Sequence, residues 1–384
     1  MNPRSHPRSD VAVIGAGPSG SCAAAEMAGN GHSVIVFESR KEVGKPVNCG
    51  EALSKNTLEA AGLSTDGPWI VNEINGYRIR SPSGENLFSA TEGFNIRRDI
   101  FDKELVNKAV ESGAVLKLKS PVLKINNYES GWTIRSKDGI FKSDYLVLAC
   151  GMNKTLIEQA FPDYSPVVMR SLGAKIDIPK EGNELLFHVK GELEGGYGWF
   201  FPRGDEINIG VVTPNDPAED LKWLMRIHDL HPSSIKRYQG GLLPINGMER
   251  ICTENNAILV GDSGGFTNPI SKGGIIGAVL SGKEGGKAVS KYLSGDTESL
   301  ENWKREMIEH PAFTPMNLDR MRILSSLNDE LLDHLTSIAK GRDIWSIRKT
   351  EIIKEAWKRP NLVRSLRGTM RLIKGGKEWA RWAF

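Results

Sequence analysis

The stretch from residue 10 to residue 38 constrains the fold of this chain more than any other part. Two short apolar runs, residues 11–14 and 34–37, flank the turn Gly15-Ala16-Gly17-Pro18-Ser19-Gly20 and a run of small residues that is typical of a helix. The acid Glu38 follows the second run directly. Strand, glycine turn, helix, strand and acid in this order predict a dinucleotide-binding βαβ unit.

The residue types in the turn suit such a site. Gly15 allows the tight turn, Gly17 lets the backbone approach a pyrophosphate, and Gly20 lets the helix pack on the strand. The start of the helix offers free N–H groups to the phosphates. Glu38 can accept hydrogen bonds from a ribose 2′-hydroxyl. This stretch alone leaves the choice between NAD and FAD open.

A second pair of motifs narrows the choice of cofactor. Residues 257–260 are expected to form a strand that delivers Asp262 beside the first glycine turn, as an acceptor for the hydroxyls of a ribityl chain, which NAD lacks. The turn Gly273-Gly274-Ile275 opens the next predicted helix. Its N–H groups and positive dipole suit the N1/C2=O edge of a flavin that becomes anionic when reduced. FAD therefore fits better than NAD.

The composition is ordinary for a soluble protein of two or three domains, with 384 residues, 39% hydrophobic and 25% charged. No run approaches the roughly 18 apolar residues of a spanning helix. The four cysteines form no CxxC pair, which argues against zinc and iron–sulfur sites, so no metal is expected. We expect a reducing, cytoplasmic location.

The charge is unevenly distributed. The net charge is +3, but residues 340–384 hold thirteen Lys and Arg against four acids, so that they carry +9 and the rest −6. Within residues 361–384, an apolar and a basic stripe recur at helical spacing, which predicts a basic amphipathic helix. Such a helix either attaches to anionic lipid or docks on the protein with its basic face solvated.

The order of predicted strands and helices indicates an α/β (α+β) fold with an inserted sheet. Residues 10–80, 91–164 and 252–298 are expected to form a discontinuous FAD-binding Rossmann-like domain. Residues 81–90 and 165–251 are expected to form an antiparallel-sheet domain that binds substrate. We expect a flexible arm at residues 1–9 and a helical C-terminal region at residues 299–384, basic from residue 340.

Together these motifs resemble those of the FAD-dependent geranylgeranyl reductase family, closest to its archaeal digeranylgeranylglycerophospholipid reductases. The resemblance implies a fold of the para-hydroxybenzoate hydroxylase type. It is carried by the first glycine turn with Glu38, Cys49-Gly50-Glu51, Arg98 before Phe101-Asp102, Gly261-Asp262, Pro269 with Gly273-Gly274-Ile275, and Gly196-Tyr197-Gly198-Trp199-Phe200-Phe201-Pro202, which is similar to the signature Y-x-W-x-F-P.

Four positions depart from the family pattern. The trailing glycine pair of the signature reads Gly210-Val211-Val212, and the second flavin motif reads Ala149-Cys150-Gly151. Asn268 stands where the acid before Pro269 is usual, and Lys272 replaces the first glycine of the following triplet.

The resemblance implies a flavin-dependent reductase that hydrogenates C=C bonds of geranylgeranyl chains in membrane lipid precursors, as in archaeal ether lipid saturation. An isolated alkene has no carbonyl to polarise it, so a hydride must be matched by a proton, delivered in a dry apolar tunnel. No second GxGxxG appears, so electrons are expected from ferredoxin or transiently bound NAD(P)H. The expected partners are a polyprenyl lipid and a membrane surface, with peripheral attachment, and no nucleic acid.

Tyr197, Trp199 and Phe201 alternate along one predicted strand and so share one face. From spacing alone, a plain sheet core is the favoured interpretation. The resemblance instead implies that they line the tunnel beside the flavin, with Pro202 as a further substrate-binding residue. It implies Cys49, Tyr197 and Trp199 as catalytic candidates.

The candidate cofactor-binding residues combine both glycine motifs with positions that the resemblance implies. Without the resemblance, Cys49 is equally typical of a small buried apolar residue and Arg98 of a solvated residue at a helix start. The full set is Gly15, Gly17, Ser19, Gly20, Glu38, Cys49, Gly50, Ala52, Arg98, Val122, Gly261, Asp262, Gly273, Gly274 and Ile275.

Two other functions fit the same motifs. A flavin monooxygenase of this fold would oxidise an aromatic or isoprenoid substrate with O2. A non-catalytic, flavin-containing protein would bind or carry polyprenyl lipid.

Overall fold

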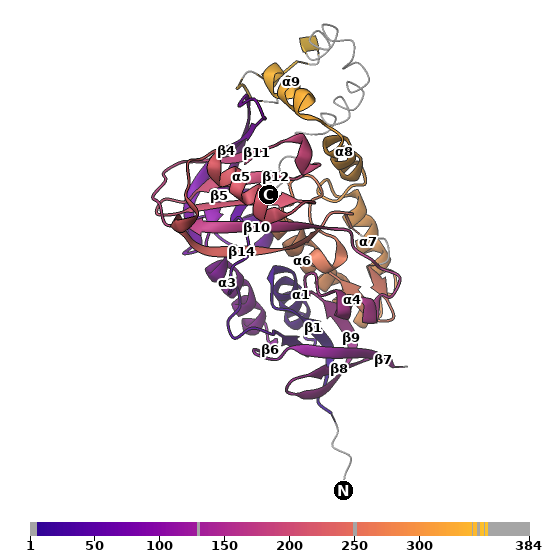
Figure 1. Cartoon of the computed structure of the whole chain (residues 1–384). Coiled ribbons are helices and arrows are strands. Elements are labelled where there is room, and N and C mark those ends of the chain that lie inside the picture. Colours follow the sequence, from indigo (N-terminus) through magenta and orange to yellow (C-terminus); the bar gives the residue numbers. More distant parts are fainter. Residues whose placement is uncertain are drawn as a thin grey trace.

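The computed structural model describes residues 6–128, 131–248, 252–339, 341–343, 346–348 and 350–351. In this part of the chain, two eight-stranded sheets lie one above the other in the view of Figure 1, with helices beside and between them. None of the described helices is both long and apolar enough to cross a bilayer. The predicted amphipathic helix at residues 361–384 lies outside the described residues.

The first sheet is built on parallel strands, as the buried apolar runs predict. Its order is β15-β16-β9-β1-β2-β6, and the hairpin β7–β8 continues it antiparallel from β9. Arg8 already pairs with Lys142, so residues 8 and 9 belong to β1 and not to the expected flexible arm. The strands are β1 (Arg8–Ile14), β2 (Val34–Phe37), β6 (Val115–Lys117), β7 (Val122–Tyr128), β8 (Gly131–Ser136), β9 (Gly139–Leu148), β15 (Thr253–Glu254) and β16 (Ala257–Leu259).

The second sheet has the order β14-β10-β13-β12-β11-β4-β5-β3 and is antiparallel except where β11 runs parallel to β4. The turn-rich, alternating pattern of this region favours such pairing. Its strands are β3 (Ala52–Ser54), β4 (Ile70–Arg80), β5 (Asn86–Ile96), β10 (Val168–Ile176), β11 (Glu184–His188), β12 (Tyr197–Pro202), β13 (Ile207–Thr213) and β14 (Ile235–Pro244).

The hairpin β4–β5 and the short β3 lie in the second sheet, whereas the sequence-based division placed most of these residues with the cofactor domain. The reason is the pairing of Tyr77 with Leu185 and its neighbours, which joins β4 to β11 across more than a hundred residues. Local alternation predicts that a strand forms, but it carries no information about so distant a partner. The division into domains otherwise stays a prediction.

The helices surround the first sheet and extend beyond it. Figure 1 shows α7, α8 and α9 following one side of the molecule toward the second sheet. The described helices are α1 (Pro18–Gly29), α2 (Lys55–Ala61), α3 (Arg98–Glu111), α4 (Lys154–Ala160), α5 (Pro217–Arg226), α6 (Ile275–Leu293), α7 (Ser299–Glu309), α8 (Met316–Ser325) and α9 (Asp329–Ala339), with short 3-10 turns η1 (Gly191–Leu193), η2 (Pro232–Ser234) and η3 (Gly261–Gly264).

Helices α1 and α6 run parallel and touch along their backbones. A Cβ at Gly282 would lie 2.2 Å from the carbonyl oxygen of Ser19, and one at Gly286 would lie 2.7 Å from the carbonyl oxygen of Ala23. Any side chain at these two glycines would force the helices apart. The small residues therefore bring the first turns of two long helices into one neighbourhood.

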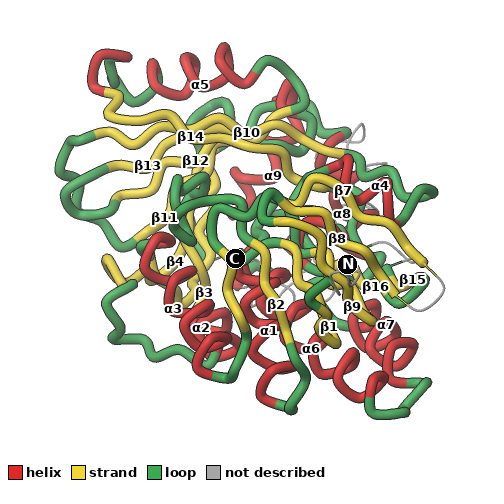
Figure 2. The backbone as a smooth tube through the Cα atoms, turned by 90° about the horizontal axis from the view of Figure 1, so that it is seen from below, coloured by secondary structure: helices red, strands yellow, loops and turns green. Residues whose placement is uncertain are grey.

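The two faces of the second sheet bury different clusters. Phe200 points to one face and packs with helix α5, which Figure 2 shows lying across the outside of the sheet. Trp199 and Phe201 point to the opposite face and join a second apolar cluster with Phe187. This inner face is directed at the first-sheet half of the molecule.

Candidate functional site

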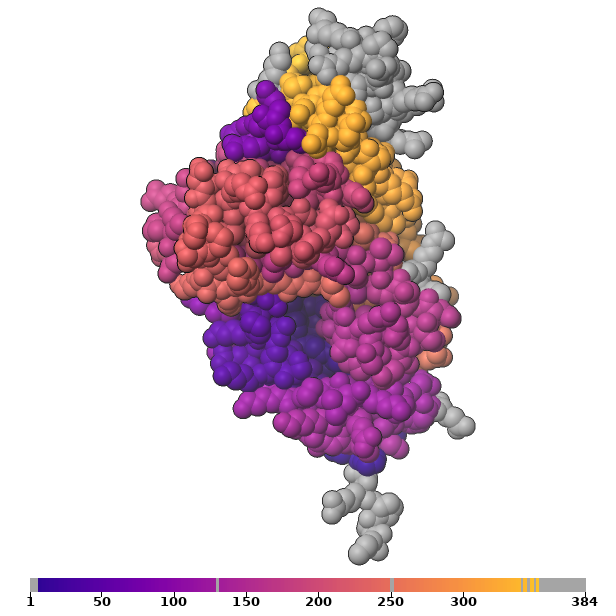
Figure 3. Space-filling view, viewed as in Figure 1, coloured from indigo at the N-terminus to yellow at the C-terminus, as the bar shows by residue number. Residues whose placement is uncertain are grey.

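A cavity of about 520 Å³ lies between the first-sheet half and the inner face of the second sheet. Figure 3 shows a hollow between these two halves of the molecule. The β1–α1 turn, the loop before β3, strand β12 and the start of α6 all line it. Both motifs that the sequence singled out therefore meet at one cavity.

The first glycine turn presents backbone to the cavity. Gly15 has a φ of +103°, and a Cβ there would press on the carbonyl of Ala149. Gly17 has nothing within 4 Å of the position of a Cβ. Helix α1 has no side-chain cap, so the N–H groups of its first turn remain free for phosphate oxygens.

Glu38 closes the same end of the cavity. Its side chain is held in place because Oε2 accepts from the Ala16 amide at 3.0 Å and Oε1 accepts from the Arg40 amide at 2.9 Å. Carboxylate oxygens each have room for a further donor. The predicted ribose acceptor is thus fixed in position beside the turn.

The second glycine motif lies against the start of α1, where Gly261 contacts Ser19. Asp262 in η3 accepts from the Thr267 hydroxyl at 2.7 Å, and its Oδ1 would lie 3.1 Å from a Cβ at Gly274. Burial raises the pKa of Asp262, an effect that Thr267 and Arg98 only partly offset. Helix α6 also starts without a side-chain cap. Two uncapped helix starts and a carboxylate therefore line one cavity.

The loop that carries Cys49 is tied to the second sheet through one side chain. Asn208 on β13 donates from Nδ2 to the carbonyl oxygens of Cys49, at 2.8 Å, and of Gly50, at 3.1 Å. Its Oδ1 accepts from Trp199 Nε1 at 3.0 Å and from Gln239 Nε2 at 2.7 Å. Asn208 thus fixes the position of the cysteine loop relative to the aromatic strand β12.

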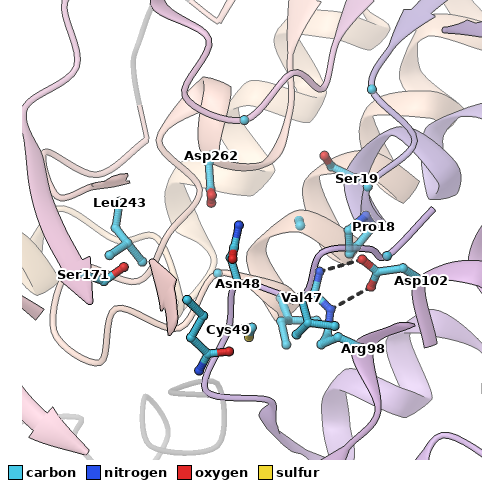
Figure 4. A pocket seen from close by; sticks show the side chains of 18 of the residues that line it. Pro18, Ser19, Val47, Asn48, Cys49, Arg98, Asp102, Ser171, Leu243 and Asp262 are labelled. Carbon is cyan, nitrogen blue, oxygen red and sulfur yellow. Dashed lines mark hydrogen bonds and ion pairs between the residues drawn. The ribbon is translucent and has the colours of Figure 1, made fainter. Parts of the chain in front are cut away.

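Arg98 lines the cavity beside Cys49, as Figure 4 shows. Its Nε and Nη2 donate to the two carboxylate oxygens of Asp102, at 2.7 and 2.8 Å. Burial lowers the pKa of Arg98, but Asp102 and the Cys49 side chain raise it by more, so the net shift is upward. The Cys49 sulfur accepts from the Glu51 amide at 3.2 Å and also faces this guanidinium.

Glu51, two residues after the cysteine, is the centre of a buried ionic cluster. Its carboxylate contacts Lys175 on β10, lies 3.5 Å from Arg203 and accepts from the Arg98 amide at 3.1 Å. Glu206 also pairs with Lys175 and Arg203, so that two acids balance two bases. This cluster joins the cysteine loop to both halves of the molecule.

The opposite wall of the cavity is aromatic. Tyr197, Trp199 and Phe201 all line it, on one face of β12. Phe187 on β11 packs edge-on against Tyr197, with ring centroids 5.1 Å apart, and against Phe201, at 5.3 Å. The indole of Trp199 lies over Gly210 on the paired strand, in space that a Cβ there would fill.

Tyr197 connects this wall to the second glycine motif. Its hydroxyl donates to the carbonyl oxygen of Ser271, just before the start of α6. Burial, together with the nearby Cys49, raises the pKa of Tyr197. The phenol therefore stays protonated at neutral pH.

Most of the sequence-predicted residues line the cavity, and three do not. Gly20 packs against the carbonyl of Gly15, Gly261 lies against Ser19, and the Pro202 carbonyl accepts from Asn95. The residues that line it are Gly15, Gly17, Ser19, Glu38, Cys49, Gly50, Ala52, Arg98, Val122, Tyr197, Trp199, Phe201, Asp262, Gly273, Gly274 and Ile275.

Sequence reasoning missed Phe187, Gln239 and Lys272, which also line the cavity. The alternation of Leu185 and Phe187 predicts that they share one face of β11, but it does not predict which face lines the cavity. Nothing in the sequence marks Gln239 as a cavity residue. The only sign at Lys272 is that it stands where the family pattern has a glycine. Among the described residues, no group of three or more His, Cys, Asp and Glu is placed to hold a metal ion.

Comparison with known proteins agrees with this geometry. A family model described as an NAD(P)-binding Rossmann-like domain matches residues 13–57. The chain is 28% identical to digeranylgeranylglycerophospholipid reductase 1 of Methanosphaera stadtmanae, over 92% of this chain and 94% of that protein. It is 29% identical to digeranylgeranylglycerophospholipid reductase of Thermoplasma volcanium, over 93% and 98%. The resemblance to geranylgeranyl reductases is confirmed.

Solved structures show the same relationship. A geranylgeranyl bacteriochlorophyll reductase-like protein from Thermoplasma acidophilum superposes with a TM-score of 0.81 at 26% identity, over 94% of this chain and 99% of that chain. The flavin-dependent brominase Bmp2 superposes with a TM-score of 0.65 at 20% identity, over 92% and 99%, a likeness of fold alone. The predicted α/β fold with a second sheet is confirmed.

Proposed function

We propose that this protein is a flavin-dependent reductase that hydrogenates C=C bonds in the geranylgeranyl or other polyprenyl chains of membrane lipid precursors. The observation that carries the proposal is the pairing of two walls in one cavity: uncapped helix starts with two acids on one side, and an aromatic wall on the other. The names of the similar proteins support the same activity.

FAD is the cofactor that these residues fit. The open space at Gly17 and the free amides of α1 suit the pyrophosphate, and Glu38 suits the adenosine ribose. Asp262 suits the ribityl hydroxyls, and the amides at the start of α6 suit the pyrimidine edge of the flavin. When bound and reduced, FAD would supply the hydride for the alkene.

The chain itself must supply the proton and exclude water. Cys49 is our candidate for the proton donor, because its sulfur is the acceptor in its contacts with the Glu51 amide and the Arg98 guanidinium, which leaves the thiol hydrogen unused. The same two donors would stabilise the thiolate that remains. Tyr197 and Trp199 donate their own hydrogens to Ser271 and Asn208, and so shape the tunnel.

The apolar side chains that line the cavity support a prenyl chain as the substrate. Phe187, Phe201, Val212 and Leu243 offer apolar surface to a prenyl chain. Because such a lipid resides in a bilayer, we propose that the protein works at the cytoplasmic surface of the membrane. Ferredoxin or transiently bound NAD(P)H would provide the electrons.

The test is a single anaerobic turnover. FAD-loaded protein is reduced chemically and mixed with an unsaturated digeranylgeranylglycerophospholipid, and flavin absorbance and lipid mass are followed. We expect the flavin to reoxidise while the lipid gains two hydrogens per reduced double bond. A lipid that binds without reoxidising the flavin would overturn the proposal in favour of a carrier. Oxygenated product from the same mixture in air would favour a monooxygenase.

A further inference from the structure

Lys272 is a buried cation at the edge of the cavity. It is 4% exposed, lines the cavity, and directly precedes Gly273 and Gly274 at the start of α6. Its Nζ donates to the carbonyl oxygen of Pro269. An ammonium has three hydrogens, so this single contact leaves two available.

Lys272 has no counter-charge in the part of the chain that the structure describes, where no carboxylate forms an ion pair with it. Lys175, which is 8% exposed, differs from Lys272 in having two counter-charges, because Glu51 and Glu206 both contact its ammonium. Burial alone lowers the pKa of Lys272 to about 8. A buried cation is costly unless an anion or strong dipole compensates it.

The surroundings add positive potential instead of compensating it. Helix α6 is 19 residues long and begins at Ile275, with Gly274 as an N-cap that supplies no side-chain hydrogen bond, so its free amides and its dipole present partial positive charge at the same place. Asp262, the acid of the second glycine motif, accepts from the Thr267 hydroxyl and contributes nothing to the pKa shift of Lys272, whose only cause is burial. The position is therefore prepared for a ligand group that carries negative charge.

We infer that the Lys272 ammonium is the counter-charge for the pyrimidine edge of the bound flavin, and that with the start of α6 it favours the flavin forms that carry negative charge at N1. This inference rests on the FAD assignment made above and not on the identity of the substrate. Lys272 replaces a glycine of the family pattern, so the charge is a property of this chain.

Sulfite binding measures this effect without any turnover. Sulfite adds to N5 of oxidised flavin through a new N–S bond, which leaves negative charge on the N1/C2=O edge. A cation beside that edge strengthens the adduct, by about tenfold or more for a buried charge. The dissociation constant is read from the loss of flavin absorbance in the FAD-loaded full chain.

Three variants make the measurement specific. Lys272→Met removes the charge and keeps most of the volume, and Lys272→Arg keeps the charge. Lys272→Gly also removes it, at a φ of +57° that glycine adopts without strain, so this variant is expected to fold. The matched control is Lys283→Met, which removes a lysine of α6 whose Nζ donates to the Ala60 carbonyl at 3.1 Å, away from the cavity.

We expect sulfite binding to weaken about tenfold in Lys272→Met and Lys272→Gly and to stay near wild type in Lys272→Arg and Lys283→Met. Unchanged sulfite affinity in both uncharged variants, with FAD still bound, overturns the inference alone. Failure of the wild-type chain to reduce the lipid, with the expected sulfite shift in the uncharged variants, overturns the proposed substrate alone. Failure of the wild-type chain to bind FAD overturns both.

Discussion

The two walls of the cavity use different parts of the chain. The wall formed by the glycine turns presents backbone amides at the starts of α1 and α6, and its glycines matter because a Cβ would fill the space. The wall formed by the second sheet presents side chains, with Phe187, Tyr197 and Trp199 in contact across two strands. Backbone amides bind any ligand with phosphates in the right place, whereas the side chains select what lies against it.

The difference also concerns tolerance to change. Replacing a glycine of the backbone wall by a larger residue fills the space beside the amides. Replacing an aromatic residue of the side-chain wall by a smaller one leaves a cavity. Glu51 joins the two, since its carboxylate contacts Lys175 of the second sheet and the first amide of α3.

Breaking the junction should have the largest effect. Glu51→Gln leaves Lys175 and Arg203 with Glu206 alone, and we expect the free energy of unfolding to fall by about 3 kcal/mol, measured by urea denaturation. The control is Glu184→Gln, which removes a partly exposed ion pair with Arg78 and should cost less than about 1 kcal/mol. Equal losses in the two variants would show that Glu51 is no junction.

Two alanine substitutions separate folding from binding on the backbone wall. Gly15→Ala forces a side chain into a φ of +103° against Ala149, and should cost about 2 to 3 kcal/mol of stability. Gly17→Ala has open space and extended backbone, so it should leave stability unchanged but weaken FAD binding about tenfold, measured by fluorescence titration. Full FAD affinity in Gly17→Ala would contradict the pyrophosphate assignment.

Lowering the pH should destabilise the second sheet. His188 and His228 share an Nε2···Nε2 contact of 2.8 Å, and burial lowers the pKa of His188 to about 3 and of His228 to about 4. Because the unfolded chain binds protons near pH 6.5 and the folded chain does not, stability is full above pH 6.5 and falls as the pH drops.

Between pH 6.5 and 5 the pair should cost about 2 kcal/mol, less than the full linkage value because His228 is partly exposed. Denaturation midpoints across this range provide the measurement. His228→Phe removes one titrating group and should reduce the slope. A slope identical to that of the wild type would exclude the pair as its source.

The smallest effect is expected at the contact between the walls. Tyr197→Phe removes the hydrogen bond to the Ser271 carbonyl and should cost about 1 kcal/mol of stability. FAD binding should be kept, while the rate of flavin reoxidation by lipid falls as the tunnel loosens. An unchanged single-turnover rate would limit Tyr197 to packing.

The backbone wall could be predicted from sequence because its residues lie close together along the chain. Gly15, Gly17 and Glu38 follow a fixed spacing that a βαβ unit requires. Strand alternation likewise predicted that Tyr197, Trp199 and Phe201 share a face, and the structure directs that face at the cavity. Only the resemblance indicated what the face lines.

The rest depends on contacts between distant residues. The pairing of β4 with β11, the link from Asn208 to the cysteine loop and the ion pairs of Glu51 join positions about a hundred or more residues apart. No local periodicity encodes such partners. The same holds for Gln239, which reaches the cavity because β14 pairs with β10 at the edge of the sheet.

The contact of α1 with α6 has a consequence for the cofactor. Gly282 and Gly286 set how closely the helices approach, and the two helix starts are thereby fixed at a constant separation by rigid elements. The packing of the two helices, and not the conformation of loops, then sets the distance between the site for the phosphates and the site for the ring of a ligand. We therefore expect a dinucleotide of matching length to bind without rearranging the protein, and a shorter nucleotide to reach only one of the two helix starts.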